Sequence, residues 1–378
     1  RIEGNMLRML HLADLHLGYK PSYLDESRAA IRQKERDQLL EKAANFALDP
    51  AQKIDLVFIV GDLFETHRPA EKLVRAAIEQ LQRLEGAGIC CVTVPGNHDE
   101  RSYFDSVYRV NKEKWPGILV QNPMPALVAR RDIKGLPDWI YSLAYTGGLT
   151  KVSSLGDFPR EQEEGLHIGA FHGTLDWDPG ERSLPLKSTA LAKANYSYIA
   201  LGHLHSFQEH KVGKTLAVYP GAVESKSTGE QGVGHFTVVN FQQGKISLEK
   251  PAVAVREHAR VELDISTLYS VEDVIAACRR ERDPEKIMEI RFKGTPRFAI
   301  DVEKVQDELQ ADFFHLQLVD ESSFIDWSQI EKYSGEHTIR GAFTKRILSR
   351  MQEAQGEREK EVLKLALLKG LAVFQRGE

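Results

Sequence analysis

The feature of this sequence that most limits its fold is a series of five short apolar runs, each followed by acidic, amide or histidine residues. The runs are rich in residues that favour β-strands and are bounded by Gly, Asp or Pro. They cover residues 9–12, 56–60, 89–94, 168–171 and 198–201. Helical patterns separate the first three runs, over about 28–48 and 69–85. This alternation predicts an α/β fold built around buried strands.

The polar residues after these strands include a set of potential metal ligands: Asp14, His16, Asp62, Asn97, His172, His203 and His205. Because the carboxyl ends of strands in an open α/β sheet share one rim, we expect these side chains to converge. Glycine precedes Asp62, Asn97 and His203, where close backbone approach leaves little room for a Cβ atom. Mixed imidazole, carboxylate and amide donors suit manganese, iron or zinc. The pattern therefore predicts a centre for two divalent cations that share a bridging carboxylate.

Length and charge limit the classes of protein to consider. A chain of 378 residues is too long for one ordinary core and predicts two or three compact units. The net charge of −5 argues against a surface that is basic overall, although it is compatible with a local basic groove for nucleic acid. No apolar run approaches the roughly 20 residues that a membrane span needs.

The three cysteines indicate thiols in a reducing compartment. Cys90 and Cys91 are adjacent in a strand-like run, so their side chains should point to opposite faces of the sheet. With Cys278 they fit small buried hydrophobic residues better than a disulfide or a thiolate metal site. We also find no signal-peptide pattern, and we therefore expect a cytoplasmic protein.

The chain divides into segments of different pattern. Residues 6–250 form the first predicted domain, which ends in strands at 216–219, 235–241 and 246–248. A Pro-containing linker follows at 250–255, and then a small α/β unit over 259–330. Residues 336–378 predict two helices broken near Gly356. The first five residues, 1–5, resemble a protease-site remnant, so Met6 is the expected native start.

The motifs, in their order along the chain, resemble those of the calcineurin-like metallophosphoesterases. They are Asp14-x-His16, Gly61-Asp62, Gly96-Asn97-His98-Asp99, His172 and Gly202-His203-x-His205. The residues in and around these motifs resemble those of the SbcD branch of DNA-repair nucleases. They read Leu-Ala-Asp-Leu-His-Leu-Gly, Gly-Asp-Leu-Phe and Gly-His-Leu-His. Members of that branch pair with a coiled-coil ABC ATPase of the SbcC type. The likeness covers residues 13–205 and extends through Tyr219-Pro-Gly.

The resemblance implies a fold and a ligand set. The fold would be a four-layer α-β-β-α sandwich with a small α/β capping domain and C-terminal helices. Asp14, His16 and His205 would bind the first cation, Asn97, His172 and His203 the second, and Asp62 would bridge them. The implied cofactors are two manganese ions, with iron, magnesium or zinc as alternatives.

The resemblance also implies catalytic roles for His98 and Asp99. His98 would face the scissile phosphate and stabilise charge or protonate the leaving oxygen. Asp99 would orient the His98 ring, as carboxylates next to metal centres often orient imidazoles.

One position departs from the family pattern. After Gly-Asp-Leu-Phe, archaeal and eukaryotic members carry a histidine, whereas this chain has Glu65 and places His67 two residues later. His67 is a candidate for substrate contact, with an exposed loop histidine as the alternative. Arg101, Tyr103 and Lys226 are further candidates for phosphate or base contact, the alternatives being loop packing and solvent exposure.

The C-terminal helices carry an apolar stripe that allows two interpretations. The stripe consists of Phe343, Ile347, Met351, Leu363, Leu367, Leu371 and Phe374. Such a stripe commonly packs in a core, but the resemblance implies a surface at 336–378 that grips the ATPase coiled coil. The resemblance further implies DNA as substrate and a homodimer.

Three functions follow from these observations. The first is a manganese-dependent DNA exonuclease or endonuclease, the nuclease subunit of an SbcCD-type complex for double-strand-break repair. The second is a small-molecule phosphodiesterase or phosphatase on the same catalytic domain, against which the additional C-terminal units argue. The third, a non-enzymatic scaffold, conflicts with the complete set of ligand-type residues.

Overall fold

The computed structural model describes residues 6–147, 157–177, 182–228, 230, 232–296, 298, 300–322 and 327–376. The chain forms two compact units, Arg1–Val255 and Arg256–Glu378, which are considered separately. Residues 1–5, which resemble a protease-site remnant, lie outside the described residues. No helix within the described ranges is both long and apolar enough to cross a membrane.

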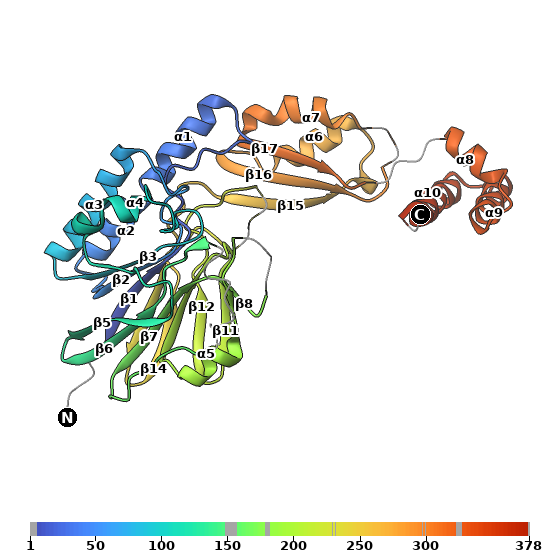
Figure 1. Ribbon diagram of the computed structural model, residues 1–378. Coiled ribbons are helices and arrows are strands. Elements are labelled where there is room, and N and C mark those ends of the chain that lie inside the picture. Colours follow the sequence, from blue (N-terminus) through green and yellow to red (C-terminus); the bar gives the residue numbers. More distant parts are fainter. Residues whose placement is uncertain are drawn as a thin grey trace. The chain divides into compact units, whose positions relative to one another are not determined.

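Two six-stranded sheets form the centre of the first unit (Figure 1). In the first sheet, β1 (Leu7–Leu12), β2 (Leu56–Val60), β3 (Cys90–Val94) and β4 (Ile118–Leu119) run parallel. On the other side of β1 lie the antiparallel strands β13 (Thr237–Gln242) and β14 (Lys245–Glu249). Every residue of β2 is buried, as expected for a parallel strand covered on both faces.

The second sheet has the same plan. Strands β6 (Leu136–Ser142), β7 (Leu166–His172), β10 (Tyr198–Gly202) and β12 (Thr215–Tyr219) run parallel. Antiparallel edge strands complete the sheet, β5 (Ala126–Ile133) beside β6 and β11 (Gln208–Val212) beside β12.

Three hydrophobic clusters produce the layers of the first unit. Side chains from β1, β2 and β3 pack against those from β7, β10 and β12 in a cluster between the two sheets. The outer face of the first sheet is covered by α2 (Leu39–Leu48) and α3 (Glu71–Gly86). The outer face of the second sheet carries α5 (Ser188–Ala194). The predicted α/β sandwich, with layers in the order α-β-β-α, is confirmed.

The sequence predicts the central strands and α3, whereas β4, β11 and α5 were not predicted, and further differences concern a helix and a hairpin. The single helix expected over 28–48 is two helices, α1 (Glu26–Asp37) and α2, separated at Gln38. The two helices bury different side chains: α1 buries Arg32 and Arg36, which bind Glu224 and Ser225, whereas α2 buries apolar residues. The hairpin β5–β6 was not predicted, since β5 carries a run of charged residues that obscures its alternation.

The second unit contains a parallel sheet and a helical segment. The sheet has the order β15 (His258–Asp264), β16 (Asp283–Lys293) and β17 (Phe313–Asp320). Helices α6 (Val271–Arg279) and α7 (Val302–Leu309) pack against it. The remaining helices are α8 (Trp327–Ser334), α9 (Ile339–Glu353) and α10 (Glu357–Arg376). The expected break near Gly356 is confirmed, whereas α8 was not predicted.

The apolar stripe of the C-terminal helices is mainly a packing surface. Leu367 and Leu371 of α10 are fully buried with Ile330 of α8, and stripe residues of α9 pack against them. Among the described large apolar side chains of α9 and α10, the exposed ones are Ile339, Val362 and Val373. This packing supports the core interpretation of the stripe, and the partner surface over 336–378 stays a prediction.

One short helix and two short strands lie in loops of the first unit. They are α4 (Val107–Val110), β8 (Thr174–Leu175) and β9 (Pro185–Leu186). Cys91 packs under the helices and Cys90 against the cluster between the sheets, which confirms their opposite orientation. Cys90, Cys91 and Cys278 are all free thiols.

Candidate metal centre

The loops after the central strands have an unusual backbone. Asp14, His16, Asp62 and His203 all adopt positive φ, at 56°, 48°, 52° and 101°. This region of backbone space disfavours residues with a Cβ atom, and it persists where the surroundings enforce it. The Asp14 amide donates to the Gly61 carbonyl at 3.1 Å, and the His16 amide donates to the Asp62 carbonyl at 2.9 Å. Backbone hydrogen bonds therefore join the loops after β1 and β2.

The glycines of the motifs make room for the polar side chains. A Cβ atom on Gly61 would lie 2.0 Å from His172 Nδ1, and one on Gly96 would lie 2.2 Å from Asp62 Oδ1. A Cβ atom on Gly202 would lie 1.9 Å from the Val60 carbonyl oxygen. The expectation that these glycines allow close approach is confirmed.

One group of donor atoms comes from Asp14, His16 and His205. The Nε2 atoms of His16 and His205 are 3.3 Å apart, and each lies 3.9 Å from Asp14 Oδ1. That oxygen is buried and has no hydrogen-bond partner among the described residues. Since a buried carboxylate oxygen without a partner is costly, this arrangement fits a bound cation.

A second group comes from Asn97, His172 and His203. The Asn97 side-chain oxygen lies 3.0 Å from His172 Nε2 and 2.9 Å from His203 Nδ1. On its other side, His172 donates from Nδ1 to the Val60 carbonyl at 2.8 Å, which directs Nε2 toward the group.

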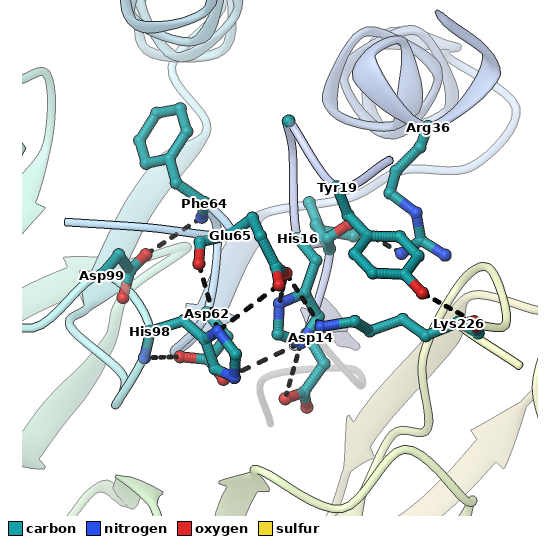
Figure 2. Close-up of polar contacts among 12 residues, drawn as sticks. Asp14, His16, Tyr19, Arg36, Asp62, Phe64, Glu65, His98, Asp99 and Lys226 are labelled. Atoms are coloured by element: carbon teal, nitrogen blue, oxygen red, sulfur yellow. Dashed lines mark hydrogen bonds and ion pairs between the residues drawn. The ribbon is translucent and has the colours of Figure 1, made fainter. Parts of the chain in front are cut away.

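Asp62 stands between the two groups. Its Oδ2 atom lies 3.8 Å from His16 Nε2 and 3.3 Å from His172 Nε2. Its Oδ1 atom accepts a hydrogen bond from the His98 backbone amide at 2.8 Å (Figure 2). The donor atoms of Asp14, Asp62 and His172 lie within 4.8 Å of one another, as do those of Asp14, His16 and His205. All seven side chains predicted as ligands thus meet at one place, and Asp62 has the position of a bridge.

Burial and charge perturb the titration of the site. Burial raises the pKa of Asp62, but His172 and other imidazoles outweigh burial and hold it well below its usual value. Burial opposes the charged form of His172, yet the Asp62 carboxylate raises the pKa of His172 to about 9. For His203, burial and then the nearby His172 lower the pKa to about 4. Unequal pKa values within one compact group are typical of functional sites.

His98 lies at the open side of this centre. Its ring is 4.7 Å from that of His16 and nearly perpendicular to it, and about 30% of its side chain is exposed. Its Nδ1 atom lies 3.1 Å from the Glu65 carbonyl oxygen. An imidazole that is partly exposed beside buried ligands is well placed to contact a substrate.

The position of Asp99 corrects the role expected for it. Its carboxylate accepts hydrogen bonds from the backbone amides of Phe64 and Gly96 and from the Tyr108 hydroxyl. Burial, and then the Asp62 carboxylate, raise the pKa of Asp99 to about 6. Asp99 thus holds two loops together, and the group next to the His98 ring is Glu65.

Two glutamates that the ligand prediction did not include contact the candidate ligands. Glu65 Oε2 lies 2.8 Å from His16 Nδ1 and 2.8 Å from Lys226 Nζ (Figure 2). Glu230 Oε1 lies 3.0 Å from His205 Nδ1. Glu65 is visible in the sequence as a departure from the family pattern, whereas no sequence signal identified Glu230.

The candidate substrate residues have different surroundings. The His67 and Tyr103 rings are stacked at 4.1 Å, and Tyr103 is 48% exposed beside Phe104, which is 84% exposed. Arg101 donates to the carbonyl and side-chain oxygens of Gln121. Lys226 is ion-paired with Glu65. Among these candidates, the His67–Tyr103 stack offers an open aromatic surface, while Arg101 and Lys226 are engaged within the protein.

Comparison with known proteins gives one family match and several relatives. The calcineurin-like phosphoesterase family matches residues 7–207. The DNA double-strand break repair protein Mre11 of Thermoplasma acidophilum is 27% identical over 297 residues, which cover 73% of this chain and 74% of that protein. The uncharacterized metallophosphoesterase YhaO of Bacillus subtilis is 24% identical over 79% of this chain and 74% of its own length. The Mre11 protein of Methanopyrus kandleri is 25% identical over 81% of this chain and 69% of its own length.

Proposed function

This chain belongs to the calcineurin-like phosphoesterases, and we propose that it is a two-metal DNA nuclease, an exonuclease or endonuclease that acts in double-strand-break repair. The observation that carries this proposal is the convergence of seven imidazole, carboxylate and amide side chains around Asp62. The similarity to Mre11 proteins over about three quarters of the chain supports DNA as the substrate.

The ligand set we propose is the one expected from the sequence. Asp14, His16 and His205 would hold one cation, Asn97, His172 and His203 the other, and Asp62 both. The unpartnered Asp14 Oδ1 atom and the absence of thiolates among these donors fit manganese, and they also fit iron, magnesium or zinc. Two divalent cations held there would stabilise the charge of a phosphodiester and make water a stronger nucleophile.

The protein's own residues would orient the substrate and move a proton. The His98 backbone amide is bound to Asp62, so the imidazole keeps a fixed position beside the ligands. From there the ring would donate a proton or a hydrogen bond to the leaving oxygen. Asp99 would act indirectly, by holding the loops of Phe64 and Gly96 in place.

Further parts of the proposal concern partners and surroundings. A coiled-coil ATPase of the SbcC type would bind the helices of residues 336–378 at exposed apolar positions, which include Ile339 and Val362. The unit over 259–330 would act as a capping domain that positions DNA. The stacked His67 and Tyr103 rings would contact a base. We further propose a homodimer and a cytoplasmic location, where a bacterial-type repair complex meets its DNA.

A nuclease assay in manganese tests this function. Duplex and single-stranded DNA labelled at the 5′ or 3′ end would be incubated with the protein, alone and with an SbcC-type ATPase. We expect metal-dependent cleavage that Asp14→Ala abolishes. His98→Asn should lower the rate by about 10²–10⁴-fold, the usual effect of losing a general acid, while leaving manganese binding intact.

The same assay separates the alternatives. Hydrolysis of bis-p-nitrophenyl phosphate without cleavage of any DNA would instead indicate a small-molecule phosphodiesterase. No bound manganese and no hydrolysis of either substrate would contradict the proposed enzyme and favour a scaffold. Full activity in both variants would contradict the assigned roles of Asp14 and His98.

A further inference from the structure

The two histidines of the first candidate cation site differ from His172 of the second in the group that each contacts through Nδ1. His205 Nδ1 forms a hydrogen bond with Glu230 Oε1 at 3.0 Å, and His16 Nδ1 lies 2.8 Å from Glu65 Oε2 in an ion-pair contact that is not aligned as a hydrogen bond. In the second site, His172 has a neutral backbone carbonyl at Nδ1, that of Val60. A carboxylate partner fixes the tautomer of a ligating imidazole and increases its basicity more than a neutral acceptor does.

We propose that Glu65 and Glu230 are positioning residues that hold His16 and His205 by their Nδ1 atoms and thereby strengthen one of the two cation sites selectively. This inference rests on the proposed two-metal function. With the proton kept at Nδ1, each imidazole presents the lone pair of Nε2 toward Asp14, from which both Nε2 atoms lie 3.9 Å. The site that contains Asp14, His16 and His205 is then the one that depends on these carboxylates.

Lys226 links the two glutamates. Its ammonium group lies 2.8 Å from Glu65 Oε2, and its backbone amide donates to Glu230 Oε2 at 2.8 Å. Its ammonium group also lies 4.5 Å from the centre of the Tyr19 ring, whose hydroxyl donates to the Lys226 carbonyl. Contacts therefore connect the two histidines through Glu65, Lys226 and Glu230. Figure 2 shows the part of this set that runs from His16 through Glu65 to Lys226.

The test measures manganese binding to the full chain rather than activity. Binding of Mn²⁺ would be followed by calorimetry and by the paramagnetic resonance signal of the free ion. We expect Glu65→Gln and Glu230→Gln each to weaken one of two binding events by about 10–100-fold, the usual effect of removing such a partner, and to leave the other nearly unchanged. Glu41→Gln, at an exposed position of α2, is the matched control and should bind like the wild type.

Two further measurements distinguish positioning from a merely structural contact. Lys226→Met removes the ion pair but keeps both carboxylates, so its effect on affinity should be much smaller than that of Glu65→Gln. In the zinc-loaded protein with ¹⁵N-labelled histidine, Glu65→Gln should shift the Nδ1–H resonance of His16 and leave that of His205 in place. Glu230→Gln should do the reverse.

The outcomes separate this inference from the proposed function. If the wild type binds two Mn²⁺ ions and cleaves DNA, but both glutamine variants bind them equally well, the positioning role is refuted and the function stands. An equal loss of affinity in Lys226→Met and Glu65→Gln would also refute it, because the ion pair would then be the cause. A wild-type protein that binds no Mn²⁺ would overturn the function and this inference together.

Discussion

The candidate ligands lie in backbone conformations that disfavour their own side chains. Asp14, His16, Asp62 and His203 have positive φ, and each such residue costs on the order of 1–3 kcal/mol. Burial of the site also perturbs its imidazoles: the Asp62 carboxylate raises the pKa of His172, whereas burial and the nearby His172 lower the pKa of His203. The rest of the first unit must offset this cost, and the hydrogen bonds between neighbouring loops are the local part of that support.

Gly96 offers a test of how tightly these loops are packed. In Gly96→Ala the new Cβ atom would lie 2.2 Å from Asp62 Oδ1 and 2.4 Å from the Asp62 amide nitrogen, so Asp62 must move. We expect a loss of stability of about 1–3 kcal/mol and weaker binding of both manganese ions, measured by thermal unfolding and calorimetry. Gly86→Ala is the control, since no atom lies within 4 Å of a Cβ built there. Equal manganese affinity in the two variants would contradict the bridging position of Asp62.

Which residues meet at the site was predictable, because strand ends and glycine-flanked motifs determine it. The seven candidate ligands converge as expected. The carboxylates behind them were not predictable, since Glu230 approaches His205 through a loop with no periodic pattern. Asp99 follows His98 in sequence but faces Phe64 and Tyr108, because adjacent residues in a loop need not point the same way.

At the scale of elements, apolar strands were easier to predict than charged ones. Strands β1, β2, β3, β7 and β10 lie where their apolar runs indicate. The hairpin of β5 and β6 was not predicted, although it supplies an edge and an inner strand of the second sheet. Its two strands pair with each other across the turn at Lys134 and Gly135, but the run Arg130–Asp132 in β5 gives no alternating pattern.

Strand β6 also contains a buried acid that should make stability depend on pH. Asp138 is fully buried, and neither carboxylate oxygen has a hydrogen-bond partner within the part of the chain that the structure describes. Burial, and then the Asp132 and Asp55 carboxylates, raise its pKa to about 7. Because the folded state favours the protonated form, the contribution to stability is complete below about pH 4 and is lost as the pH rises to about 7.

Asp138→Asn removes this titration. We expect the free energy of unfolding of the variant, relative to the wild type, to rise by up to about 4 kcal/mol between pH 4 and pH 8. Urea unfolding at several pH values measures the difference. Asp132→Asn, at an exposed position on β5, should give a much smaller change. A difference between Asp138→Asn and the wild type that does not vary with pH would show that Asp138 stays charged in the folded protein.

Helix α1 supports the loop that carries Lys226 and Glu230. The buried Arg36 donates to the carbonyl oxygens of Leu15, Glu224 and Ser225, so it joins the loop after β1 to the loop after β12. Arg36→Met would leave these buried acceptors without a donor, at a cost of about 2–4 kcal/mol. Thermal unfolding would measure it, with Lys34→Met, exposed on the same helix, as the control. Equal melting temperatures would show that water replaces the guanidinium.

At the scale of the whole molecule, the candidate site lies in the first compact unit, and the second unit contributes none of the predicted metal ligands. All candidate ligands and His98 lie in Arg1–Val255, whereas Arg256–Glu378 has its own sheet, helices and two hydrophobic clusters. Residues just before this boundary contact the first unit, and Arg256 just after it contacts the second. The backbone amides of Val253 and Ala254 donate to the Gly234 carbonyl, whereas the Arg256 side chain binds Glu285.

This division leads to a prediction about substrate size. A chain that ends after Val255 keeps the contacts of Val253 and Ala254 to the first unit, so we expect it to fold and to bind two manganese ions. Its hydrolysis of bis-p-nitrophenyl phosphate should stay within about threefold of the full chain, because a small ester needs only the metal centre. Cleavage of duplex DNA should fall by at least about 10-fold if residues 259–330 position DNA, since lost orientation raises the barrier of the chemical step. Comparing both rates at equal manganese occupancy measures this. Equal loss of both activities would mean that the second unit supports the fold, whereas unchanged DNA cleavage would mean that the first unit alone binds the nucleic acid.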